Sequence, residues 1–140
     1  MTEQQTPVVV VGMVPNPRGQ AALAHGLRES RLRGARLVVV NASRGDALVD
    51  EDFVQGEALT RLHEELAASG VPAEVRQPVH GRDVAEELAE VVAETSAELL
   101  VIGMRRRSAV GKLLMGSAAQ RILLEVDCPV LAVKNPPREG

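Results

Sequence analysis

A basic loop late in the chain carries the residues best suited to bind a ligand. Between Gly103 and Ser117 lie three consecutive arginines, Arg105–Arg107, and Lys112, and this stretch has no acidic residue. The loop ends where a helix is expected to begin, and the unpaired N–H groups and dipole of a helix start favour an anion. Glycines let the backbone approach a ligand closely. We therefore predict a phosphate site whose contacts are made by Gly103, Arg106, Gly116 and Ser117.

The same residues also have simpler structural interpretations. Gly103 and Gly116 could serve only as turn and helix-cap glycines, and a short run of arginines is often a solvated loop. A Walker loop is rejected, because Gly111-Lys112 is followed by Leu113 where that loop requires Ser or Thr. The phosphate site and the purely structural loop both stay open on these residues alone.

The loop after the first expected strand argues against two other ligand-binding folds. Gly12-Met13-Val14-Pro15 contains one glycine, so it lacks the glycine-rich fingerprint of a dinucleotide-binding domain. A phosphoacceptor receiver domain needs carboxylates at this place to hold magnesium, and Met13 and Val14 supply none. These two apolar residues, together with Val40, instead predict an apolar slot for a base.

Catalytic and metal-binding groups are not predicted in this chain. His25, His63 and His80 are far apart, and none has a second ligand at metal-binding spacing. Cys128 is the only cysteine, which excludes an internal disulfide, and it is expected to pack as a small hydrophobe. Acidic residues on two expected helices are interpreted as solvated faces, namely Glu57, Glu64, Glu65, Glu86, Glu87, Glu90 and Glu94. The residues therefore favour a binding protein over an enzyme.

Strands and helices alternate along the chain and must position the basic loop. Short apolar runs, mostly β-branched, predict buried strands at residues 8–11, 37–40, 99–102 and 130–133. The stretch 73–79 alternates apolar and polar residues and contains Pro78, which predicts a strand at a sheet edge. Helical spacing of apolar residues is found at 23–27, 59–66 and 84–92, and again from Ser117, whose side chain can cap a helix.

This alternation predicts an α/β domain with a five-stranded parallel sheet and helices on both faces. For five strands we expect the order 3-2-1-4-5, which places the reversal of winding between the first and fourth strands. A ligand crevice is expected there, between the loops at 12–19 and 103–117. The chain is interpreted as one domain over residues 1–140, with flexible tails at 1–6 and 135–140.

Composition argues against several classes of partner. The formal charge of −3 gives no global attraction to nucleic acid or to an anionic membrane, and Phe53 is the only Phe, Trp or Tyr available for stacking on bases. No apolar run approaches the roughly 20 residues of a membrane span, and the N-terminus lacks the pattern of a signal peptide. We expect a cytoplasmic protein with neither a nucleic-acid nor a membrane partner.

At the basic loop the chain resembles the universal stress protein family. The ATP-binding members of that family carry a glycine, two residues, a second glycine, nine residues, and then glycine followed by serine or threonine. Gly103 matches the first position and Gly116-Ser117 the last two, while Arg106 stands at the second glycine. The resemblance extends from residues 8–12 through Gly81-Arg82-Asp83 to residues 128–131. It implies a Rossmann-like fold of the adenine nucleotide alpha hydrolase type in a small stress-response module.

The resemblance implies ATP or AMP as a ligand, without any cofactor being required. In nucleotide-binding relatives an aspartate after the first strand contacts the adenosine portion, and Val14 stands at that place here. Losing a hydrogen bond to a charged group, worth about 1.5–3 kcal/mol, would weaken binding roughly ten- to a hundredfold. A left-handed backbone at Arg106 would cost on the order of 1 kcal/mol, although its guanidinium could grip a phosphate.

Two hypotheses about function follow. The chain is either a nucleotide-responsive module with weak or altered affinity, or a structural stress protein that holds no nucleotide. An enzyme that hydrolyses ATP ranks last, because no water-activating base or metal ligand can be placed near residues 103–117.

The last expected strand is an apolar sheet edge, and an exposed edge of this kind would pair with strands of other chains and aggregate. The resemblance implies a homodimer in which this strand pairs across a twofold axis. Its residues are Pro129, Val130, Leu131, Ala132 and Val133.

Overall fold

Five parallel strands form one sheet in the computed structural model, which describes residues 6–13, 17–41, 49–77, 83–104 and 117–134. Their order is β3-β2-β1-β4-β5, which confirms the predicted topology. The strands are β1 (Val8–Met13), β2 (Arg36–Asn41), β3 (Ala73–Arg76), β4 (Leu99–Met104) and β5 (Val130–Lys134). The predicted tails, residues 1–6 and 135–140, lie outside the described residues apart from Thr6.

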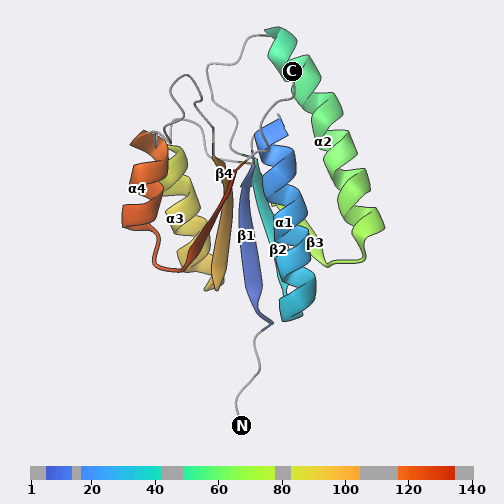
Figure 1. Cartoon of the computed structure of the whole chain (residues 1–140). Helices are drawn as coiled ribbons and strands as arrows, with labels where there is room; N and C mark the ends of the chain where they lie inside the picture. Colours follow the sequence, from blue (N-terminus) through green and yellow to red (C-terminus); the bar gives the residue numbers. More distant parts are fainter. Residues whose placement is uncertain (1–5, 14–16, 42–48, 78–82, 105–116, 135–140) are drawn as a thin grey trace.

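Helices cover both faces of the sheet, as Figure 1 shows. The four described helices are α1 (Pro17–Arg33), α2 (Val49–Ser69), α3 (Val84–Thr95) and α4 (Ser117–Glu125). The chain passes from β1 outward to β3 through α1 and α2, and then back to β4 and β5 through α3 and α4. The first pair of helices therefore packs on one face and the second pair on the other.

Each face of the sheet has its own apolar core, because successive side chains of a strand point to opposite sides. Val9 and Val11 belong to the core under α1 and α2, whereas Val8 and Val10 belong to the core under α3 and α4. All four of these valines are buried. Burial on both faces explains why the central strands are continuous apolar runs in the sequence.

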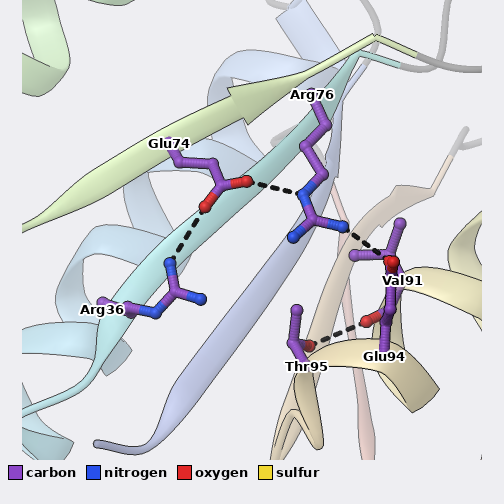
Figure 2. A network of polar contacts seen from close by, with 6 residues as sticks. All are labelled: Arg36, Glu74, Arg76, Val91, Glu94 and Thr95. Carbon is purple, nitrogen blue, oxygen red and sulfur yellow. Dashed lines mark hydrogen bonds and ion pairs between the residues drawn. The ribbon is translucent and has the colours of Figure 1, made fainter.

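The edge strand β3 is shorter than the stretch 73–79 that the sequence predicts, and two of its four residues are charged. Glu74 accepts hydrogen bonds from Arg76 Nε at 2.6 Å and from Arg36 Nη1 at 3.0 Å. Arg76 Nη1 in turn donates to Glu94 Oε1 of α3 at 2.8 Å. Figure 2 shows this chain of alternating charges running from β2 across β3 to α3. We call these four side chains the charged ladder.

Among the described side chains, the acidic residues that the sequence predicts to be solvated are exposed, with one exception. His25 and His63 are exposed, and so are Glu64, Glu65, Glu86, Glu90 and Glu94. Glu87 of α3, predicted to be solvated, is instead buried at 8% exposure. His80 and the side chain of Glu57 lie outside the described residues.

Candidate functional site

Gly12 lies at the centre of the carboxyl edge of the sheet. It pairs in register with Val40 of β2 on one side and with Ile102 of β4 on the other. A Cβ added at Gly12 would lie 3.0 Å from Leu88 Cδ1, so α3 packs closely over the end of β1. The strand order reverses between β1 and β4, and in open parallel sheets this reversal is where ligands bind. The register therefore brings residues of three strands together at the expected place.

Gly103 and Ser117 occupy the two ends of the predicted phosphate loop. Gly103 is half-buried near the end of β4, where it pairs with Val133 of β5. Ser117 is the first residue of α4, as predicted. Because α4 follows β4 in the chain, its start and the end of β4 face the same edge of the sheet. Because the start of an α-helix favours an anion, this edge suits the phosphate that is expected there.

Val40 is placed beside the site, but its side chain is almost fully buried. It is 1% exposed and belongs to the core under α3 and α4. The structure thus gives Val40 a packing role, while its contact with a base stays a prediction. Other predicted site residues, Val14, Arg106 and Gly116, lie outside the described residues, as do the side chains of Met13 and Ser117.

Sequence reasoning missed an ion pair between the starts of the two helices at this edge. Arg121 Nη1 of α4 lies 2.7 Å from Oδ2 of Asp83, the residue that precedes α3. Arg121 Nη2 also lies 3.1 Å from Glu125 Oε2, one turn further along α4. Its neighbouring carboxylates raise the pKa of Arg121, chiefly through the hydrogen bond to Glu125. The sequence pattern that could have indicated this pair is the position of Arg121, four residues after the start of α4.

Asn41 is a second polar group that the sequence did not single out. It is half-buried at the end of β2, in register with Met13 of β1. Its Nδ2 donates to Gln77 Oε1 at 3.5 Å, which is a long and weak hydrogen bond. This amide is a further hydrogen-bonding group beside the apolar slot predicted for a base.

Cys128 packs as the sequence predicted. It is half-buried against the core under α3 and α4, close to the beginning of β5. Burial raises the pKa of its thiol above the ordinary value, and the neighbouring Asp127 adds to this. A thiol with a raised pKa is a poorer nucleophile, which agrees with the packing role predicted for Cys128.

Neither a metal centre nor a membrane span is found in the part of the chain that the structure describes. No three His, Cys, Asp or Glu side chains there are arranged to hold a metal ion. None of the described helices is both long and apolar enough to cross a membrane.

Taken together, the strand order and the helices on both faces define a doubly wound α/β domain whose winding reverses between β1 and β4. The model of the universal stress protein family matches residues 6–134. A universal stress protein of Mycolicibacterium smegmatis is 50% identical over 127 residues, which cover 91% of this chain and 97% of the relative. The chain therefore belongs to the universal stress protein family.

Solved structures agree with this fold. The universal stress protein of Archaeoglobus fulgidus is 28% identical and superposes with a TM-score of 0.74, over 92% of this chain and 98% of that one. A structure of the A. fulgidus universal stress protein in complex with dAMP has 24% identity and a TM-score of 0.67, with the same coverage of both chains. Because the identity to the dAMP complex is only 24%, this similarity shows the fold alone.

Proposed function

We propose that this chain is a binding module that takes up an adenine nucleotide, ATP or AMP, at the edge between β1 and β4. The observation that carries the proposal is that Gly103 and the start of α4 lie at the same edge, where the winding of the sheet reverses. Between them the sequence supplies three arginines and Lys112, which suit the charge of a phosphate. A relative with the same fold was solved in complex with dAMP, which supports an adenine ligand.

The module would act by binding and not by catalysis. The described residues contain no cluster that could hold a catalytic metal. Phosphoryl transfer needs such an ion and a group that orients the attacking water. Sustained release of phosphate from ATP, abolished by Ser117→Ala, would contradict this part of the proposal.

Native mass spectrometry of freshly purified protein tests the proposal most directly, because it reports bound nucleotide and subunit number together. Calorimetric titration with ATP and AMP then measures affinity. With Val14 at the position of the adenosine-binding aspartate, we expect a dissociation constant in the micromolar range or weaker. Sub-micromolar binding would contradict the expected loss. Val14→Asp should tighten binding roughly ten- to a hundredfold, since it restores a hydrogen bond to a charged group.

Ser117→Ala tests the phosphate end of the same site. Loss of a hydroxyl that bonds a phosphate should weaken ATP binding about tenfold or more. Ser96→Gly is a matched control, because Ser96 lies after the far end of α3 and its φ of 53° suits glycine. A chain that binds no nucleotide in any of these titrations would instead be a structural stress protein, the function that the departures at Val14 and Arg106 favour.

The edge strand β5 is the proposed homodimer surface. Val130 and Leu131 are half-buried, Ala132 is exposed, and α4 adds the exposed side chains of Leu123 and Leu124. A second copy that pairs with β5 would cover this apolar edge. Leu131→Lys and Ala132→Glu should both give monomers in light scattering, with unfolding curves as the check that each variant is folded. A dimer that persists in both variants would rule out this interface.

The cytoplasmic location stays a prediction from the sequence.

A further inference from the structure

Asp83 has the position and backbone of a helix cap, but its side chain does not cap the helix. Its φ of −69° and ψ of 146° are those of an N-cap residue, yet no hydrogen bond joins its carboxylate to the first turn of α3. Aspartate is among the preferred N-cap residues. The carboxylate is instead turned to the neighbouring helix, where Arg121 Nη1 lies 2.7 Å from Oδ2. A local stabilising contact has thus been replaced by a contact between two helices.

One atom of this ion pair is buried, although both side chains are partly exposed. Asp83 Oδ2 is removed from water, and no described residue offers it a hydrogen bond, so the guanidinium is the group that balances its charge. Both side chains are nevertheless partly exposed, at 44% for Arg121 and 40% for Asp83, so the pair contributes little to stability and its effect is on the placement of the helices.

The pair lies at the end of the α3–α4 contact that borders the proposed site. Arg121 is one turn into α4, and long side chains in a helix point back toward its start. The next residue, Ile122, packs with Ala85 and Leu88 of α3 in the core below. The core residues hold the two helices together, and the ion pair joins their starts.

We propose that Arg121 is a positioning residue of the nucleotide site, which holds the first turn of α4 against the start of α3 through Asp83. This inference rests on the proposed function. Hydrogen bonds from backbone N–H groups weaken steeply with angle and distance, so a small rotation of the first turn would misdirect its donors. The pair thereby fixes where a phosphate can bind without touching the nucleotide itself.

Two variants that remove one carboxylate each from the same guanidinium provide the test. Asp83→Asn breaks the link to α3, whereas Glu125→Gln breaks a contact that lies within α4. We expect Asp83→Asn and Arg121→Gln each to weaken ATP binding about three- to tenfold in calorimetry, with the double variant no weaker than the worse single one. Glu125→Gln should leave the affinity within about twofold.

Charge alone predicts the opposite result for Asp83→Asn. Removing a negative charge near a phosphate site should tighten binding, and it should do so for Asp83→Asn and Glu125→Gln alike. Tighter binding in Asp83→Asn would therefore overturn the proposal.

Hydrogen exchange gives a second readout: amides in the first turn of α4 should exchange faster in Asp83→Asn and Arg121→Gln but not in Glu125→Gln. Unchanged midpoints of urea unfolding would show that the fold is intact.

The outcomes for the two proposals are separable. If the wild-type protein, Asp83→Asn and Arg121→Gln all bind ATP with the same affinity, the role of Arg121 is overturned and the proposed function stands. A wild-type protein that binds no nucleotide would overturn the proposed function, and the role of Arg121 with it.

Discussion

The two faces of the sheet are alike at their centres and differ around them. Under α1 and α2, Leu23 and Leu37 are fully buried, and α1 approaches so closely that a Cβ on Gly26 would lie 2.2 Å from Val11 Cγ2. Under α3 and α4, Leu88 and Leu100 are buried equally well. That second core, however, is flanked by the charged ladder on one side and by the Asp83–Arg121 pair on the other.

Close packing and ion pairs contribute differently to the molecule. Burying a leucine contributes several times more stability than an exposed ion pair, which is typically worth about 0–1 kcal/mol. An ion pair between two elements, however, depends on their relative orientation. We therefore infer that the apolar cores on both faces hold the fold. The face under α3 and α4 also orients the helices beside the site.

The largest expected effects come from one leucine on each face. Leu23→Ala and Leu88→Ala should each lower the free energy of unfolding by about 2–5 kcal/mol, because both side chains are nearly fully buried. Urea unfolding measures the loss. Leu88 packs against Gly12 at the candidate site, so Leu88→Ala should also weaken ATP binding, whereas Leu23→Ala should not. Equal weakening in both variants would break the distinction between the faces.

A smaller effect is expected at the close contact between α1 and β1. Gly26→Ala places a methyl group within 2.2 Å of Val11 Cγ2, which overpacks the core by more than the gain in helix propensity. We expect a net loss of about 1–2 kcal/mol in urea unfolding. Val11→Ala makes room for that methyl group, so the two changes together should cost less than the sum of their separate losses. A Gly26→Ala protein more stable than wild type would show that α1 can move away.

The strands and their arrangement could be predicted because each follows from a sequence pattern with a direct physical cause. Apolar runs such as 8–11 and 99–102 are strands because a doubly covered parallel sheet has no solvated face, and a single sequence shows this plainly. The alternation of elements predicted the parallel sheet, and the strand order was expected because it is common among doubly wound folds. The polar edge strand was found through its own alternation, although the structure ends it at Arg76.

Features that depend on contacts between distant residues could not be predicted. The pairing of Asp83 with Arg121 joins side chains from two helices, and both side chains are typical of a solvated surface. Glu87 was assigned to the solvent for the same reason, although the folded protein buries it. At the site, glycine and helix-start signals located Gly103 and Ser117. The contacts of all six predicted site residues with a nucleotide stay predictions.

The smallest expected effect concerns the charged ladder at low pH. Hydrogen bonds from Arg76 and, next, from Arg36 lower the pKa of Glu74 below its ordinary value of 4.5, and these outweigh the opposing effect of burial. The folded protein therefore holds this carboxylate ionised more strongly than the unfolded chain does. The resulting stability is fully present above the unfolded-state pKa and is lost as pH falls through the folded-state pKa.

Glu74→Gln isolates this contribution. Its side chain is 40% exposed, so water and salt screen the pair, and we expect Glu74→Gln to cost less than about 1 kcal/mol at pH 7. In urea unfolding the difference from wild type should shrink as the pH falls to about 3, and it should be smaller at high salt. Glu65→Gln, at an exposed position on α2, is the control. A difference that stays constant from pH 7 to about pH 3 would mean that Glu74 acts through packing, and the second face would then differ less from the first than its ion pairs suggest.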